Sequence, residues 1–239
     1  MRLKSFLNRF AAFSFAALLS LGCVTEKPAG PEKPDEKDPT QTEGTTIADV
    51  LSAEIGGTFE LENVLVVGAN TNGVLLQQMG SYIYAFYGSE HNLQVGDLLK
   101  VSGTTTSRNG LVQFGSGCTL EKIGTAAVTF PQSETMDVQA IESYMSNPCI
   151  KYVTYSGTVL LSGNYTNLEI EGSSVVGSLD YMSEQFREHY SKHNITVTGW
   201  LFGSYKSYLY TIPVEVVDNG IPQEDVPDGA IFYSNFDAE

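Results

Sequence analysis

Short runs rich in apolar and aromatic residues, separated by polar turn signals such as Asn-Gly, recur through residues 46–217, a pattern typical of β-strands. The pattern predicts two sets of five strands. The first set comprises Thr58–Val67, Gly73–Gln78, Tyr82–Tyr87, Leu98–Thr105 and Leu111–Phe114, the last extending to Ile123. The second set comprises Val153–Leu161, Thr166–Glu171, Ser174–Tyr181, Ile195–Phe202 and Tyr208–Val217. We therefore expect a mainly β protein.

A short helical pattern precedes each set of strands. Thr46 is a suitable N-cap for the first helix, since the apolar residues in 47–51 have helical spacing. The second helix is predicted at Val138–Met145, and Asn147-Pro148 ends it. Each half of the chain thus begins with a helix and continues with five strands.

The two halves also share sequence landmarks. Val101-Ser-Gly103 matches Val197-Thr-Gly199, and a non-strand segment follows the third strand of each set, at Ser89–Gly96 and Ser183–Asn194. Five strands with such a break are the pattern of an OB-fold, a small Greek-key barrel. We predict two tandem five-stranded OB-like barrels, at residues 46–127 and 133–220. A five-stranded meander or half of a sandwich would give a similar pattern.

The first 22 residues have the organisation of an export signal. Arg2, Lys4 and Arg9 precede the uncharged apolar run Phe10–Leu21, which is too short to span a bilayer. The following Gly22-Cys23 step resembles the lipobox of bacterial lipoproteins, although Ser20 stands where that motif usually has Leu. The resemblance implies removal of residues 1–22 and a lipid anchor on Cys23. An ordinary secretory signal is the alternative.

The segments that flank the two halves differ from them in composition. Residues 23–45 are rich in Pro, Glu and Lys and have almost no apolar side chain, so we expect a disordered tether. Residues 221–239 contain Pro222, Pro227 and then the strand-like run Ala230–Phe236. That run resembles the opening strand of lectin-like jelly-roll domains, which implies the start of a missing domain. Packing of a terminal strand against the second barrel is the alternative.

The chain is strongly acidic, with 13 Lys and Arg against 28 Asp and Glu and a formal net charge of −15. Removal of residues 1–22 would take away three basic residues and no acidic one. Such a surface repels phosphate backbones, so nucleic acid is an unlikely partner. The 13 Tyr and 12 Phe show that this is not a disordered acidic tail.

Two cysteines remain after Cys23. Cys118 and Cys149 flank the join between the predicted barrels, and outside the cytoplasm they can form a disulfide that clamps this join. The alternative is two separate buried thiols, because sequence alone does not show that the two residues approach each other.

Residues 46–123 resemble the OB-fold domains of Gram-negative surface lipoproteins. The resemblance is carried by Gly73–Gln77, Tyr82–Phe86, Val95–Gly103 and the hairpin Asn109–Leu111. The second half matches more loosely, since it lacks the Val-Gly-Asp step. In that family these barrels are often accessory to a lectin-like or hydrolase domain. The motifs include no catalytic residue, so the resemblance implies none here.

Motifs of catalysis are missing from the sequence. It has no Gly-x-Ser-x-Gly elbow, no phosphate-binding Gly-Lys-Ser/Thr loop and no His-Glu-x-x-His. His189 and His193 share one face of a helix predicted at Glu184–His193, but further ligands for zinc are lacking. We interpret this helix as a solvated lid and predict no enzyme activity, no cofactor and no metal.

Aromatic residues mark a candidate binding hairpin in the second half. With Tyr205 at the tip, Phe202 would pair with Tyr208 and Trp200 with Tyr210, placing four rings on one face. In OB-folds this loop helps to bind oligonucleotides and oligosaccharides. Tyr205, Tyr208, Phe202 and Tyr210 are therefore candidate ligand-binding residues. The alternative is that the rings close the end of the barrel.

A second aromatic row lies on the third strand of the first half. Tyr82, Tyr84 and Phe86 alternate and so share one face, where they belong either to a core or to a binding surface.

These observations predict a non-catalytic lipoprotein of the outer membrane or cell surface that acts as a binding or scaffold module. Its partner would be a glycan or a protein, and its membrane contact would be the lipid. The first alternative is the N-terminal accessory part of an extracellular nuclease or glycanase whose catalytic domain is absent. The second is an OB-fold nucleic-acid binder.

Overall fold

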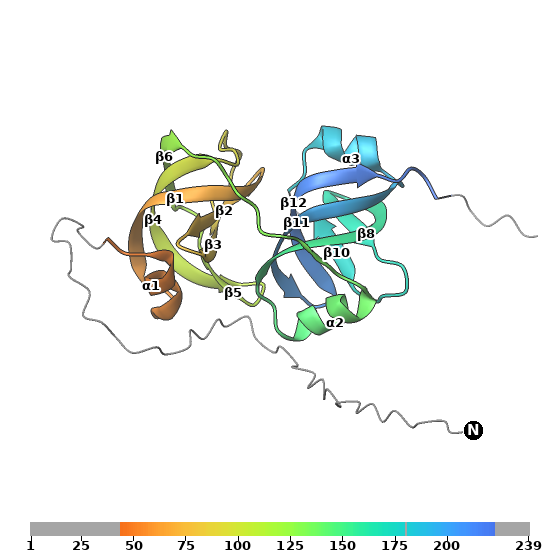
Figure 1. Ribbon diagram of the computed structural model, residues 1–239, viewed down its shortest axis with the longest axis horizontal. Helices are drawn as coiled ribbons and strands as arrows, with labels where there is room; N and C mark the ends of the chain where they lie inside the picture. Colours follow the sequence, from red (N-terminus) through yellow and green to blue (C-terminus); the bar gives the residue numbers. More distant parts are fainter. Residues whose placement is uncertain (1–43, 180, 223–239) are drawn as a thin grey trace, which may run out of the picture. The chain divides into compact units, whose positions relative to one another are not determined.

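The computed structural model describes residues 44–179 and 181–222, which form a mainly β protein (Figure 1). The first half contains α1 (Ile47–Ser52), β1 (Thr58–Asn70), β2 (Gly73–Gln78), β3 (Ser81–Phe86), β4 (Asp97–Arg108), β5 (Leu111–Phe114) and β6 (Thr119–Thr125). The second half contains β7 (Glu134–Thr135), α2 (Val138–Ser146), β8 (Ile150–Ser162), β9 (Tyr165–Glu169), β10 (Val176–Leu179), α3 (Glu184–Tyr190), β11 (Asn194–Tyr205) and β12 (Tyr208–Asp218).

The first half is a closed five-stranded barrel, as the sequence predicted. Its strands pair in the order β1-β2-β3-β5-β4, and β4 pairs back onto β1 to close the barrel. This is an OB-like arrangement, and β6 adds a sixth strand beside β4. Helix α1 begins with the predicted N-cap: the Thr46 side chain accepts from Asp49 N, and the Asp49 carboxylate accepts from Thr46 N.

The second half has the same strand order but is ring-like rather than a closed barrel, so the prediction of a second barrel is corrected in this respect. Its pairings run β8-β9-β10-β12-β11 and return to β8. Strands β2 and β3 pair along six positions across the turn Met79-Gly80, whereas β9 and β10 pair at three. The longer connection at 170–175 reduces the pairing on this side of the ring.

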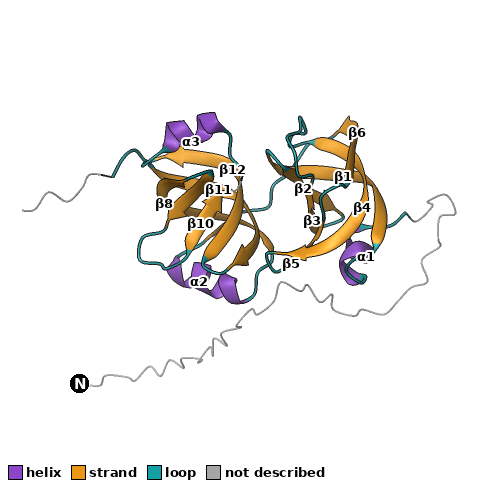
Figure 2. Ribbon diagram, turned by 180° about the vertical axis from the view of Figure 1, so that it is seen from behind, coloured by secondary structure: helices purple, strands orange, loops and turns teal. Residues whose placement is uncertain are grey.

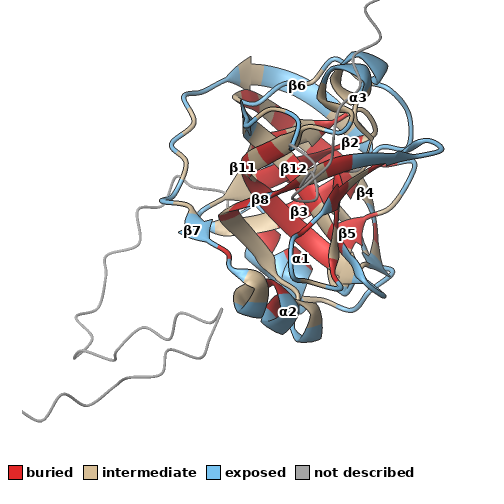
Figure 3. Cartoon of the chain, turned by 90° about the vertical axis from the view of Figure 1, so that its right-hand side faces the viewer, coloured by how far each residue is buried: buried red, intermediate tan, exposed pale blue. Residues whose placement is uncertain are grey.

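Each half has its own hydrophobic core, because alternate residues of each strand point inward. In the first half, buried residues from all five barrel strands meet α1, which contributes Ile47 and Val50. In the second half, strand residues meet α2 through Ile141 and Tyr144. Figure 2 shows α2 and α3 at opposite ends of the second sheet, and Figure 3 shows buried strand segments beside the exposed β6.

A third cluster of buried residues joins the outer faces of the two sheets. Trp200 of β11 is 2% exposed, and its Nε1 donates to Val67 O at 2.9 Å. Its ring lies 4.8 Å from the rings of both Tyr82 and Tyr152. Phe202 packs against Tyr84 in the same way, with ring centroids 4.8 Å apart. We call this cluster the junction.

A β-bulge allows the close approach at the junction. The β1–β2 register shifts between Val66 and Gly68, so that Val67 is the extra residue and its carbonyl is available to Trp200. At Gly68 a Cβ atom would lie 3.2 Å from Trp200 Cδ1, which leaves little room for a side chain. The bulge and the glycine thus position β1 against the second half.

Several predictions fall outside the described residues. These are the signal at residues 1–22, the lipid-bearing Cys23, most of the tether at 23–45, and the strand-like run Ala230–Phe236. Within residues 44–179 and 181–222, no helix has the length and hydropathy needed to cross a membrane.

Candidate binding site

The candidate site is a cavity of about 600 Å³ on the outer face of the second sheet. This volume lies within the range of about 300–1,000 Å³ that is usual for small-ligand sites. Five tyrosines line it: Tyr165, Tyr181, Tyr205, Tyr208 and Tyr210. The other described residues that line it are polar or cationic: Arg108, Ser162, Asn164, Asn167, Ser178 and Lys206.

The floor of the cavity is formed by three neighbouring strands, β9, β10 and β12. Ser178 of β10 lies opposite Asn167 of β9 on one side and opposite Tyr210 of β12 on the other. Leu168, which follows Asn167, and Leu209, which precedes Tyr210, point to the opposite face and are fully buried in the core. The alternation of each strand therefore places a polar row on the outer face.

Two hairpin loops form the rim. The β11–β12 loop carries Tyr205 and Tyr208, whose side chains are 57% and 38% exposed, and the β8–β9 loop carries Tyr165, which is 66% exposed. Helix α3 supports the second loop, since Arg187 Nη2 donates to Gly163 O. Tyrosine rings that are exposed to solvent can stack on a ligand while their hydroxyls remain hydrated.

The predicted pairing within the aromatic hairpin is wrong. Tyr205 pairs with Tyr208 across the Lys206-Ser207 turn, and Trp200 pairs with Ile212 rather than Tyr210. The register shifts between Leu201 and Ser204, where Gly203 has a φ of 120°. A period of two cannot be continued through such a bulge, because the extra residue moves every later side chain to the other face.

The predicted site residues are consequently divided between two places. Tyr205, Tyr208 and Tyr210 line the cavity, whereas Phe202 is 5% exposed and belongs to the junction. Tyr82 and Tyr84 also belong to the junction, which is neither the core of their own barrel nor an open surface. Burial raises the pKa of Tyr82 accordingly.

The first half contributes Arg108 to the site through the β4–β5 hairpin. Next to it, Asn109 O accepts from Ser204 N at 2.9 Å. Asn109 and Gly110 both have positive φ, 55° and 81°, so they form the tight turn that their sequence predicts. The β1–β2 loop makes a second backbone contact, because Thr71 N donates to Tyr181 O at 3.2 Å. The β4–β5 hairpin and the β1–β2 loop thus both contact the edge of the cavity.

Cys118 and Cys149 are not bridged to each other in the structure, which corresponds to the alternative of two separate thiols. Cys118 is a free thiol in the barrel core, where its Sγ donates to Phe86 O at 3.6 Å and burial raises its pKa to about 11. Cys149 packs against the separate core of the second half. The two residues flank the join in sequence, but each side chain belongs to a different core.

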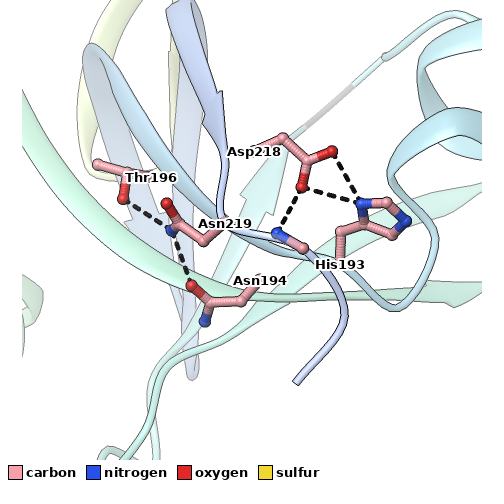
Figure 4. A network of polar contacts seen from close by, with 6 residues as sticks. His193, Asn194, Thr196, Asp218 and Asn219 are labelled. Atoms are coloured by element: carbon pink, nitrogen blue, oxygen red, sulfur yellow. Dashed lines mark hydrogen bonds and ion pairs between the residues drawn. The ribbon is translucent and has the colours of Figure 1, made fainter. Parts of the chain in front are cut away.

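The two histidines do not lie on one helix, contrary to what the sequence had predicted. Helix α3 ends at Tyr190, so His193 lies beyond it and its Nδ1 is 2.9 Å from both carboxylate oxygens of Asp218 (Figure 4). Asp218 also accepts from Gly220 N, which together with His193 lowers the pKa of its carboxyl. No group of three or more His, Cys, Asp or Glu suited to a metal occurs among residues 44–179 and 181–222.

Comparisons with known proteins identify no family. No protein-family model matches the chain, and no curated protein matches it. Among solved structures, it has a likeness to the structure of yeast Ssd1, a pseudonuclease, with 13% identity and a TM-score of 0.23. The match covers 72% of this chain and 24% of that chain, so the chain spans about a quarter of that protein. A likeness this distant carries no argument about function.

Proposed function

We propose that this chain is a non-catalytic binding module for small glycans, with its ligand site in the tyrosine-rimmed cavity of the second sheet. The observation that carries the proposal is the combination of a polar floor, Asn167 and Ser178, with exposed rings at Tyr165, Tyr205 and Tyr208. Rings stack on the apolar face of a sugar, while amide and hydroxyl groups bind its hydroxyls.

The position of the cavity supports the same proposal. In an OB-fold, oligonucleotides and oligosaccharides bind to the face of the second and third strands and to the loops that follow the first and fourth. Strands β9 and β10 and the β8–β9 and β11–β12 loops hold these places in the strand order of the second sheet. We infer that this sheet is a variant of the OB fold that keeps its ligand face.

A glycan fits the cavity better than a protein partner does. A protein surface buries apolar residues at the centre of its interface and leaves polar residues at the rim. This cavity has the opposite distribution, because its centre is Asn167 and Ser178 and its rim is aromatic. Together with the lipobox-like Gly22-Cys23 step, this favours a lipid-tethered module on the cell surface that binds sugars.

The double substitution Tyr205→Ala/Tyr208→Ala tests the proposal. Because Tyr205 is 57% and Tyr208 38% exposed, we expect a small change in melting temperature. We also expect at least a tenfold loss of affinity for the glycans bound by the unsubstituted protein on a glycan array. A tenfold loss corresponds to about 1.4 kcal/mol. Tyr87→Ala is the control, since Tyr87 is 36% exposed and does not line the cavity.

Two results would contradict the proposal. One is the absence of glycan binding by the folded protein. The other is retention of full affinity by the double variant, which would place the binding surface elsewhere.

A further inference from the structure

We propose that the ligand is an acidic sugar, and that Arg108, supplied by the first half, determines this specificity together with Lys206. The inference rests on the proposed function, since it names the class of glycan that the same cavity takes. In this proposal Arg108 of the first half and Lys206 of the second half bind the anion, and the tyrosines and neutral polar groups bind the rest of the sugar.

The first argument is the distribution of charge. The chain carries an excess of acidic residues, yet among the described residues that line the cavity the two charged ones, Arg108 and Lys206, are cations. Three other lysines have carboxylate partners: Lys100 contacts Glu60 and Glu62, Lys122 contacts Asp97 and Lys151 contacts Glu134, whereas Lys192 has none among the described residues.

Arg108 and Lys206 have no carboxylate partner among the described residues. They lie near rings instead, Arg108 at 5.8 Å from the centre of Phe86 and Lys206 at 5.3 Å from that of Tyr205. Both side chains are exposed. Each can therefore bind an anion without first breaking an ion pair.

The second argument is that the backbone fixes the position of Arg108. The neighbouring Asn109 O accepts from Ser204 N at 2.9 Å, which ties the β4–β5 hairpin to β11. At Gly203 a Cβ atom would lie 2.4 Å from Asn109 O. The β4–β5 hairpin therefore approaches β11 so closely that residue 203 has no room for a side chain. An arginine held in this way can offer its planar fork to a carboxylate with little loss of freedom.

The third argument concerns the size of the anion. Proteins that bind single-stranded nucleic acid have a positively charged groove along which the phosphate backbone runs. The described lining of this cavity has two cations in an acidic protein, which suits a single carboxylate or sulfate but not a polyanion. An acidic sugar supplies one such group beside a ring that can stack on tyrosine.

The test is a glycan array with matched pairs, in which sialic acids, uronic acids and sulfated sugars are each printed beside the neutral parent. Binding to the best acidic glycan is then measured by calorimetry for the unsubstituted protein, Arg108→Gln, Lys206→Gln and Arg108→Lys. Lys100→Gln is the control, because it removes the same charge from a lysine outside the cavity. The oligonucleotide dT8 is included as a non-sugar anion.

We expect binding to acidic members of the pairs and at least a tenfold loss in Arg108→Gln, since hydrogen bonds to charged groups are the stronger ones. Lys206→Gln should have a smaller effect, Arg108→Lys an intermediate one and Lys100→Gln almost none. Comparison of the affinities for carboxylated and for sulfated glycans identifies which anion is bound.

The outcomes separate the two proposals. Binding of neutral glycans with equal affinity in Arg108→Gln would overturn the acidic-sugar inference and leave the glycan module intact. Absence of any glycan binding would overturn both. Tighter binding of dT8 than of every acidic glycan, lost in Arg108→Gln, would assign the cavity to nucleic acid and overturn both as well.

Discussion

The two sheets have the same strand order but use their equivalent outer faces differently. In the barrel, the face of β2 and β3 carries Leu75 and Tyr84, which are paired in register and covered by Phe202 and its neighbours at the junction. In the second sheet, the face of β9 and β10 carries Asn167 and Ser178, which are also paired in register and line the cavity, with Ser178 itself buried. The face with apolar side chains is thus covered by the other half, whereas the equivalent face with polar side chains lies under a cavity.

Elementary energetics account for this difference. Apolar surface gains about 25 cal/mol per Å² when it is removed from water, so the Leu75–Tyr84 face is stable only when another surface covers it. Polar groups lose their hydrogen bonds to water when they are covered without new partners. The Asn167–Ser178 face therefore gains nothing from an apolar cover and can lie beneath a cavity that admits water or a polar ligand.

The largest expected effect comes from removing the side chain that covers the barrel. Trp200→Ala should lower the free energy of unfolding by about 3–5 kcal/mol, because the ring is buried and its Nε1 bonds Val67 O. Urea unfolding followed by circular dichroism measures this loss, and hydrogen exchange should show reduced protection in β1, β2 and β3.

Tyr205→Ala is the matched control for Trp200→Ala, since it removes a ring from the same strand on the exposed side. A loss below about 1 kcal/mol in Trp200→Ala, less than is usual for a buried ring, would show that the barrel face does not depend on its cover.

A smaller effect is expected from an ion pair between β4 of the barrel and the neighbouring β6. Asp97 is 4% exposed and binds Lys122 Nζ at 2.6 Å. Burial alone raises the pKa of its carboxyl, but Lys122 and the Gln94 N–H together hold it below its usual value. Its contribution to stability is then complete above the unfolded pKa of about 3.9 and is lost as the pH falls through the lower folded value.

Lys122→Met should remove about 1–2 kcal/mol at pH 7, because it leaves a buried carboxylate with fewer hydrogen bonds. The folded pKa of Asp97 should rise, so that acid destabilisation begins at a higher pH than in the unsubstituted protein. Melting temperatures between pH 7 and pH 3 measure both effects. Parallel pH profiles of the two proteins would contradict this account, and glycan affinity should be unchanged.

The smallest effect is expected from a pair in the second sheet, His193 and Asp218 (Figure 4). The Gly220 N–H and then His193 lower the pKa of Asp218, so its contribution is also lost as the pH falls through its folded pKa. Asp218→Asn keeps an oxygen for Gly220 but removes the charge. Its melting temperature should therefore fall less than that of Lys122→Met, with reduced hydrogen-exchange protection confined to the β12 end. A loss as large as that of Lys122→Met would show that this exposed pair is a main support of the sheet.

Local sequence signals predicted the barrel well. The span Gly73–Gln78 agrees residue for residue with β2, and the predicted start at Leu111 agrees with β5, because the Asn-Gly turns mark where both strands begin. Strand β6 was predicted only as an extension of the fifth strand, and β7 was missed because two residues carry no periodic signal. The division into domains at 46–127 and 133–220 stays a prediction, and the shared junction implies that each fragment is less stable alone.

The candidate site was predicted in part. Tyr205, Tyr208 and Tyr210 were recognised because aromatic residues near a hairpin turn are visible in sequence. Phe202 was misplaced, since nothing in its neighbourhood marks the bulge except Gly203. Arg108 was missed altogether, because only the packing of one half against the other brings it to the cavity, and no local pattern encodes that contact.

The junction has a consequence for binding stoichiometry. The barrel face that would otherwise take a ligand is occupied by Trp200 and Phe202 of the same chain, and the barrel loops hold the second half through Thr71 and Asn109. Each chain should therefore bind one ligand, not two, despite its repeated strand order. A monovalent module gains avidity only when many copies lie close together, and a lipid tether on a membrane is a means of achieving such a density.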